Sequence, residues 1–245
     1  MATASQSIRE IVASQASAAS VLQRFEIDLC SNASQSLSQA CSHLQLSVEQ
    51  VLEKLAVAEA DQSGAPPIDP SSMSLEKLVQ YIVRRHHRNV RQELPRLAAL
   101  AHKLAGKHGE HAPELIAIDR LMDELHGDMI AHLEKEENIL FPYIVHLDQH
   151  LGLARPTASA CFRRVSQPVR TMMNEHTSAL RLLSDLRSLT NEFTAPEWAC
   201  ANHVSFHTGL RAFERDLKLH IDLEDDVLFP RAVDLEDSIG ARLQG

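Results

Sequence analysis

The sequence predicts an all-α protein in which a small helical domain precedes an up-down four-helix bundle. Aromatic residues make up only 4% of the 245 residues, while Leu, Ala, Glu, Gln and Arg are abundant. Four long segments repeat apolar residues every three or four positions, which is the spacing of one buried helix face. No segment shows the alternation expected of a β-strand.

A cluster of glycine and prolines separates two periodic regions, as an interdomain linker would. The cluster consists of Gly64, Pro66, Pro67 and Pro70. We therefore expect a small domain at residues 1–60, a linker at 61–73 and the bundle at 74–245. Within the small domain, the segment from Ser47 to Gln50 has the pattern of a capping box that opens a short helix.

The bundle helices are expected at roughly 74–106, 113–146, 159–192 and 196–235. Pro113 and Pro196 suit a first helical turn, where the missing N–H would have no partner anyway. The apolar stripes of the first and third helices contain Val79, Val83, Val90 and Leu94, and Val169, Met173, Leu180 and Leu183. Those of the second and fourth contain Ile118, Met122, Leu125, Met129 and Ile139, and Phe206, Leu210, Phe213, Leu217 and Val227.

Charge and cysteine usage narrow the class of protein. The 24 basic and 33 acidic side chains give a formal net charge of -9, so nucleic acid is not an expected partner. No apolar stretch approaches the roughly 20 residues of a membrane span, and no signal peptide begins the sequence, so we expect a soluble cytoplasmic protein. The cysteines form no C-x-x-C pair and are expected to be reduced thiols. They are Cys30, Cys41, Cys161 and Cys200.

A histidine and a glutamate four residues apart occur twice, each time shortly before a Leu-Phe-Pro sequence. The first pair is His132 and Glu136, and the second is His220 and Glu224. Residues at this spacing share one face of a helix. Because both pairs fall inside apolar stripes, each pair is expected to point into the bundle.

Two further histidines complete the candidate site. His87 and His176 lie in the stripes of the first and third helices and precede the two pairs at almost equal distances. The helices therefore direct four histidines and two glutamates to one interior point. Such a set is sufficient for two metal ions, and imidazole with carboxylate favours iron over calcium or thiolate-held zinc.

Other interpretations of these polar residues remain open. A single histidine in an apolar stripe is more often a hydrogen-bonded core residue, but two buried carboxylates without partners would cost several kcal/mol. A metal-free polar network and a zinc site are the alternatives, although six ligands exceed a four-coordinate zinc site. His86 is expected beside the site or at the surface. The remaining histidines, including His43, His102, His108, His111, His146, His150, His203 and His207, are expected to be solvated or locally hydrogen-bonded.

The repeated H-x-x-x-E pattern resembles the hemerythrin-like superfamily rather than the ferritin-like proteins, which use E-x-x-H. The sequence is most similar to the repair-of-iron-centres family, of the ScdA, YtfE, DnrN and NorA type. Besides the two pairs, the resemblance rests on the segments from His87 to Pro95, Asn174 to His176, Ala18 to Cys30 and Leu37 to Leu44. The family has two adjacent cysteines followed by glycine, whereas this chain has Cys30-Ser31-Asn32.

The resemblance implies specific roles for the candidate residues. It implies two iron ions held by His87, His132, His176 and His220 as terminal ligands and by Glu136 and Glu224 as bridging carboxylates. Asp128 and Asp216, one turn before the histidines of the two pairs, could bond a second ring nitrogen, line an access path or be solvated. Glu175 could also line an access path.

The resemblance further implies a cytoplasmic non-haem di-iron protein of the nitrosative and oxidative stress response. Such a protein repairs damaged iron–sulfur clusters by iron donation and binds nitric oxide at its di-iron site. Two alternatives stay open: a protein that sequesters nitric oxide or oxygen, and a slow nitric oxide reductase. A non-enzymatic role is preferred, the expected partners are damaged iron–sulfur proteins, and a homodimer is compatible with the sequence.

Overall fold

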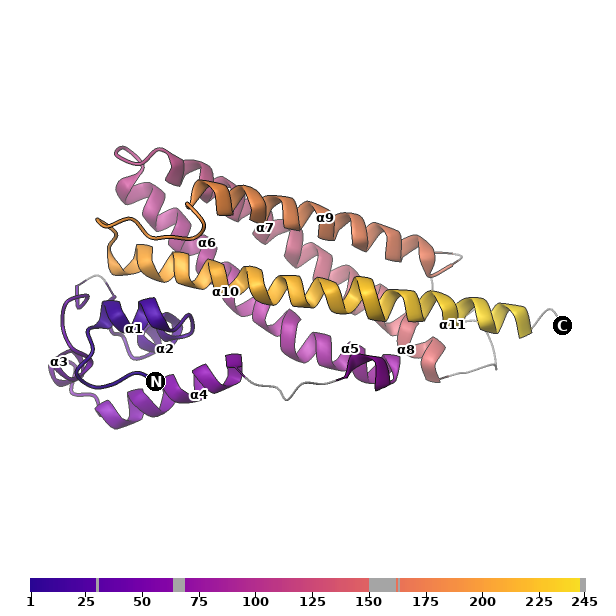
Figure 1. Cartoon of the computed structure of the whole chain (residues 1–245), viewed down its shortest axis with the longest axis horizontal. Coiled ribbons are helices and arrows are strands. Elements are labelled where there is room, and N and C mark those ends of the chain that lie inside the picture. The colour runs from indigo at the N-terminus through magenta and orange to yellow at the C-terminus, as the bar shows by residue number, and fades with distance from the viewer. Residues whose placement is uncertain (30, 64–68, 150–161, 163, 243–245) are drawn as a thin grey trace. The chain divides into compact units, whose positions relative to one another are not determined.

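The protein is helical throughout the part of the chain that its structure describes. The computed structural model describes residues 1–29, 31–63, 69–149, 162 and 164–242. Among these residues there is no strand, and an isolated antiparallel bridge joins Ser7 to Ser36. The predicted all-α fold is confirmed (Figure 1).

The chain divides into two compact units that differ from the predicted segments. The first contains Met1–Ile68, Leu97–Asp119 and Arg187–Ala212, and the second contains Asp69–Arg96, Arg120–Leu186 and Phe213–Gly245. The long helices of the bundle each contribute residues to both units, which the sequence pattern did not indicate. The division at 1–60, 61–73 and 74–245 stays a prediction, and residues 64–68 of the expected linker lie outside the described residues.

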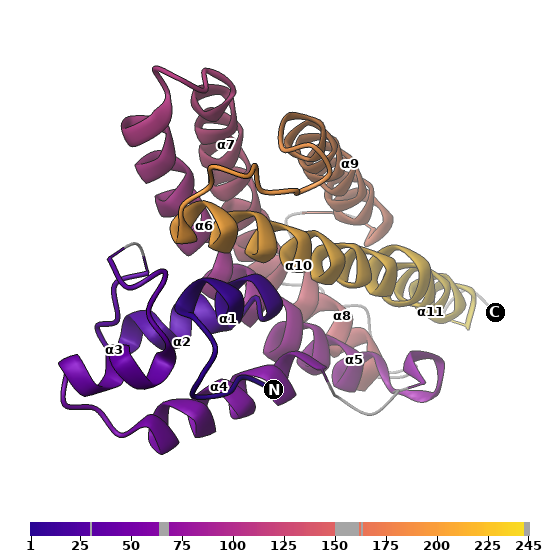
Figure 2. The ribbon, with the colours of Figure 1, turned by 60° about the vertical axis from the view of Figure 1, so that its left-hand side comes forward.

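Four helices form the N-terminal part of the first unit and lie together in Figure 2. They are α1 (Ile8–Ser14), α2 (Ala18–Arg24), α3 (Leu37–His43) and α4 (Val48–Ser63). Ser7 and Ser36 open α1 and α3 with complete capping boxes. At the start of α4, the Ser47 hydroxyl accepts a hydrogen bond from the Gln50 backbone N–H at 3.3 Å. The serine half of the predicted capping box is therefore present.

An apolar core holds these four helices together. Its largest members include Ile8, Ile11, Leu22, Ile27, Leu29, Leu37 and Leu55, and Ala201 from the bundle packs with them. Cys41 is fully buried in this core, and burial, followed by the charge of Glu49, raises the pKa of its thiol. Cys41 and Cys200 are free thiols, whereas Cys30 and Cys161 lie outside the described residues.

The bundle consists of four long helical segments, and successive segments run in opposite directions (Figure 1). Their parts are α5 (Leu75–Ile82), α6 (Arg88–His108), α7 (Glu114–Lys135), α8 (Phe141–Gln149), α9 (Ser166–Leu189), α10 (Ala201–Leu223) and α11 (Phe229–Arg242). Before α5, a short 3-10 turn (Pro70–Ser72) is held by Arg231 of α11, which donates to the Pro70 and Met73 carbonyls. No helix in the described ranges has both the length and the apolarity that a membrane crossing requires.

The third and fourth bundle helices differ from their predicted boundaries. The third helix spans Ser166–Leu189 and so ends before the expected residue 192, whereas its expected start at 159 lies outside the described residues. Three consecutive residues beyond that end, Asn191, Glu192 and Phe193, adopt left-handed backbone angles that stop the helix. The fourth helix begins at Ala201 because Pro196 lies in a preceding turn, where its carbonyl accepts from the Ala199 N–H at 2.9 Å.

Three of the four long segments contain a π-helical turn. These turns span Val83–His87, Glu136–Leu140 and Glu224–Leu228, and each begins or ends at a candidate metal ligand. A π-turn inserts one extra residue into the α-helical pattern, so the buried face moves by one position. Such turns are frequent at functional sites.

The π-turns explain why some predicted stripe positions were wrong. Ile139 is 43% exposed while Leu140 is buried, and in the same way Leu228 rather than Val227 is fully buried. On α9, which has no π-turn, Met172 rather than Met173 faces the core, because neighbouring positions at the edge of a narrow stripe are hard to separate by spacing alone.

We expect Leu140→Ala to lower the free energy of unfolding by about 2–5 kcal/mol, because it removes a buried side chain. Ile139→Ala is the matched control beside it and should change that free energy by less than about 0.5 kcal/mol. Urea unfolding of the two variants measures both values. A larger loss for Ile139→Ala would contradict the π-helical register.

Candidate metal centre

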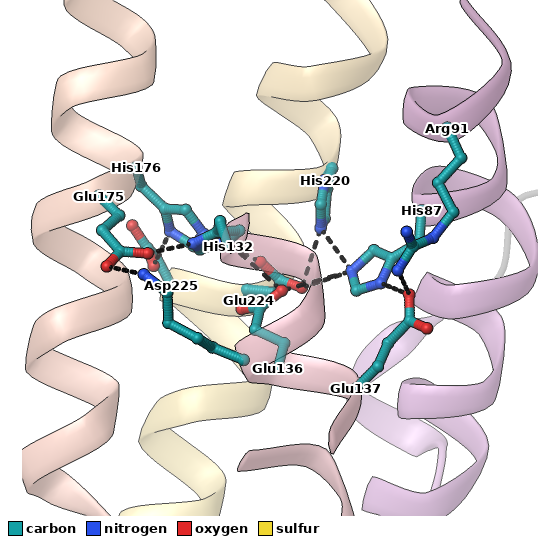
Figure 3. A network of polar contacts seen from close by, with 11 residues as sticks. His87, Arg91, His132, Glu136, Glu137, Glu175, His176, His220, Glu224 and Asp225 are labelled. Carbon is teal, nitrogen blue, oxygen red and sulfur yellow. Dashed lines mark hydrogen bonds and ion pairs between the residues drawn. The ribbon is translucent and has the colours of Figure 1, made fainter. Parts of the chain in front are cut away.

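The structure brings the six candidate residues together inside the second unit. All are at most 1% exposed, and they are His87, His132, Glu136, His176, His220 and Glu224. Figure 3 shows their side chains meeting between the helices. The convergence predicted from the stripes is therefore present in the fold.

The six residues form two overlapping groups of four. In one group the ligand atoms come from His87, Glu136, His220 and Glu224, and in the other from His132, Glu136, His176 and Glu224. Within each group these atoms lie within 4.8 Å of one another. Both carboxylates therefore belong to both groups, as the resemblance implied for bridging ligands.

Glu224 presents one oxygen to each group. Its Oε1 lies 2.9 Å from Nε2 of His220, and its Oε2 lies 3.2 Å from Nε2 of His176. Glu136 Oε2 lies 3.4 Å from Nε2 of His87 and 3.3 Å from Nε2 of His132. The carboxylates thus occupy the space between the two histidine pairs.

The helices position these groups through local spacing. His132 and Glu136 are separated by one turn at the end of α7, and His220 and Glu224 occupy the same places at the end of α10. Each glutamate is the first residue of a π-turn, which also turns the following acid outward. His87 is the last residue of the π-turn before α6.

Carboxylates contact the outward nitrogen of three of the four imidazoles. Nδ1 of His87 donates to Glu137 Oε1 at 2.8 Å, and Nδ1 of His176 donates to Asp225 Oδ1 at 2.8 Å. Glu137 and Asp225 each follow directly after a candidate bridging glutamate. Such contacts fix the ring orientation and leave Nε2 facing inward as the metal-binding atom.

The third contact involves Glu175, for which the sequence suggested an access role. Its carboxylate accepts from Nδ1 of His132 at 3.0 Å and also pairs with Lys135. Similarly, Arg91 donates to Glu137 at 3.2 Å. The roles of Glu137 and Asp225 were not predicted from the sequence, although the acidic residue after the glutamate in both repeats was a signal that could have indicated them.

His220 differs from the other three histidines. Its Nδ1 has no hydrogen-bond partner among the described residues, and the ring of His86 is stacked on it at 5.6 Å between centroids. His86 is 3% exposed, and its Nδ1 lies 3.2 Å from Asp216 Oδ1. Asn89 donates to the other oxygen of Asp216 at 2.8 Å. His86 is therefore beside the site, as one of the two expectations had it.

The two aspartates that were considered as outer partners behave differently from each other. Asp216 contacts His86 and Asn89 instead of the second nitrogen of His220. Asp128 is exposed, which matches the solvated alternative.

The electrostatics of the cluster favour positive charge next to its two carboxylates. Burial opposes protonation of His87 and His176, but their close carboxylate contacts outweigh burial and raise the pKa of each to about 10. Burial also opposes ionisation of Glu136 and Glu224, but the surrounding histidines keep the pKa of both below its usual value. The interior is thus arranged around two negative charges that positive charge must balance.

Hydrogen bonding inside the cluster is incomplete without a cation. Nδ1 of His132 and of His176 each donates to a carboxylate, so the two Nε2 atoms face each other at 3.0 Å, and only one of them can carry a proton in that contact. Neither oxygen of Glu136 has a hydrogen-bond partner among the described residues, and the same is true of Glu224 Oε2. Inward lone pairs on four imidazoles and two carboxylates fit a metal pair of the iron type.

Comparison with known proteins agrees with this geometry. Residues 78–232 match the family described as the hemerythrin HHE cation binding domain, and residues 4–59 match the ScdA_N domain, a domain of unknown function. The chain is 31% identical to an iron-sulfur cluster repair protein YtfE of Escherichia coli over 95% of this chain and 99% of that protein. A probable iron-sulfur cluster repair protein of Haemophilus influenzae is 28% identical, again over 95% and 99% of the two chains.

Replacing Glu136 or Glu224 by Ala should remove most bound metal, because each carboxylate serves both groups of ligand atoms. The unaltered chain should hold about two irons after purification with iron supplied. Asp128→Ala is the control, since this exposed acid lies on the same helix as His132. Elemental analysis measures the metal content, and an Asp128→Ala protein as depleted as the glutamate variants would contradict the assignment.

Glu137→Gln should weaken metal retention roughly 10–100-fold, because the outward nitrogen of His87 loses its charged acceptor. Glu134→Gln is the control. It changes an exposed acid three residues before Glu137 and should retain metal as the unaltered chain does. The rate of iron transfer to a coloured chelator measures the difference. Equal rates in both variants would show that Glu137 does not support the site.

Proposed function

The chain belongs to the hemerythrin HHE cation-binding family, and from this premise we propose that it is a non-haem di-iron protein that repairs damaged iron–sulfur clusters. One observation carries the proposal: two four-residue groups of ligand atoms share both of their carboxylates. Shared carboxylates hold two metal ions close together. The similar proteins are named as iron-sulfur cluster repair proteins, which supports the same role.

Iron donation requires a site that both holds and releases metal. When bound, the iron pair would supply exchangeable iron and positions for a small ligand such as nitric oxide or oxygen. The protein residues set how tightly each position is held. Carboxylates support the outward nitrogens of both His132 and His176, whereas of His87 and His220 only His87 has such a contact. We infer that the metal position of His87 and His220 releases its ion more readily.

The small N-terminal domain contributes no described thiol that is suited to redox chemistry. Cys41 is buried in an apolar core with a raised pKa, so its reactive thiolate form is disfavoured. Any thiol chemistry of this domain would depend on Cys30, which lies outside the described residues. Repair in this proposal therefore rests on the bundle and its metal.

The proposal places the protein in the cytoplasm during nitrosative or oxidative stress, with damaged iron–sulfur proteins as its partners. The free thiols of Cys41 and Cys200 suit that reducing compartment. Two alternative functions are sequestration of nitric oxide or oxygen without turnover, and slow reduction of nitric oxide. The same paired positions would serve them, because two adjacent metal positions can hold two small ligands near each other.

The order in which nitric oxide and the protein are added distinguishes these functions. If the protein repairs clusters, adding the iron-loaded chain after nitric oxide has been removed should restore the absorption of a damaged [4Fe–4S] protein. An isotopically labelled iron, ⁵⁷Fe, should then appear in the restored cluster. The Glu136→Ala variant should fail and Asp128→Ala should succeed.

Other outcomes would favour the alternatives. Protection only when the protein is present during exposure to nitric oxide would indicate sequestration. Sustained release of nitrous oxide with a reductant over many turnovers would indicate a reductase.

A further inference from the structure

A second group of histidines lies in the first unit, away from the candidate metal centre. His203 and His207 are one helical turn apart near the start of α10 and are 3% and 4% exposed. Nδ1 of His203 and both ring nitrogens of His207 have no hydrogen-bond partner among the described residues. They were expected to be solvated or locally hydrogen-bonded, and their burial excludes the first of these alternatives. Buried polar atoms without partners call for a physical reason.

The two rings pack against each other. Their centroids are 4.8 Å apart and their planes are inclined by 55°. The two ring pairs of the candidate metal centre have nearly the same geometry, with 4.8 Å and 58° in one pair and 4.7 Å and 59° in the other. Histidines four residues apart on a helix can bind one metal ion together, because both rings project from the same face.

A third imidazole lies nearby. Nε2 of His108, at the end of α6, is buried and has no hydrogen-bond partner among the described residues. The ring of Trp198 packs against both His108 and His203, with ring centroids 5.6 Å and 5.1 Å apart. Because Trp198 is 55% exposed, it can turn toward solvent and let His108 approach the pair.

The chemistry of the pair differs from that of the candidate metal centre. Burial, and then the charge of a neighbouring histidine, lowers the pKa of both rings, in His207 to about 4, although Glu114 acts against the shift in His203 and the Phe193 backbone acts against it in His207. The rings are therefore neutral at pH 7 and keep free lone pairs. Neutral imidazoles bind nickel or zinc more strongly than they bind iron(II).

We propose that His203 and His207, with His108 as a third ligand, form a further metal position for one divalent ion of the nickel and zinc class. The position is independent of the proposed repair function because its ligands belong to the first unit and share no residue with the candidate metal centre.

Trp198 provides a direct way to test this position. It is the chain's one tryptophan and contacts two of the three histidines. Adding Ni²⁺ to the iron-loaded full-length protein should quench its fluorescence saturably, at about one equivalent. Elemental analysis after desalting should find that nickel without any loss of iron. Nickel that enters only as iron leaves, or no quenching at all, would overturn the proposal.

Variants identify the ligands. The double variant His203→Gln and His207→Gln should lose nickel binding and quenching while its iron content, which reports an intact bundle, stays unchanged. His102→Gln, whose side chain is 81% exposed on α6, should behave like the unaltered chain. Should the double variant lose iron, the single variant His203→Gln decides, with an expected loss of affinity of at least about tenfold.

Unchanged nickel binding in the glutamine variants would refute the site. His108→Gln should weaken binding without abolishing it, and no effect there would remove His108 from the ligand set.

Discussion

Two buried carboxylates are the constraint on which the arrangement of the second unit depends. Glu136 and Glu224 are fully buried, where an uncompensated charge would cost several kcal/mol. Four imidazoles surround them, and three of these rings are in turn held by acids nearer the surface. Charge therefore alternates outward from the centre: carboxylates, imidazoles, acids and, at two places, a lysine or an arginine.

The π-turns connect this electrostatic arrangement to the backbone. A regular α-helix would place the residue after each candidate bridging glutamate far around the helix from the bundle interior. In two of the segments the π-turn begins at that glutamate, and the next acid contacts a histidine of another helix. The π-turn thus lets two adjacent acids contact the imidazoles from opposite sides, although the helix is less regular there.

The near-symmetry of the two repeats ends at His220. The ring of His86 is stacked on the ring of His220. The outward nitrogen of His220 lacks the acid that supports the other three rings. Asp216, at the position where the sequence repeat suggested a partner, contacts His86 instead. A repeated sequence motif has therefore produced two groups of candidate ligand atoms with unequal support, and unequal support is what the proposed iron donation would need.

The sequence alone determined the helical class, the buried pairs and the six residues that converge, because helical spacing of four residues fixes which side chains share a face. It could not reveal the π-turns, because an inserted residue leaves no mark in an apolar pattern whose edges are already ambiguous, as Ile139 and Met173 show. The sequence also could not reveal which side chains contact one another between helices. Only the tertiary structure decided that Glu137 and Asp225 hold imidazoles, because each acid and its histidine lie on different helices. It also decided that His203 and His207 are buried together, because their burial depends on how neighbouring helices cover them.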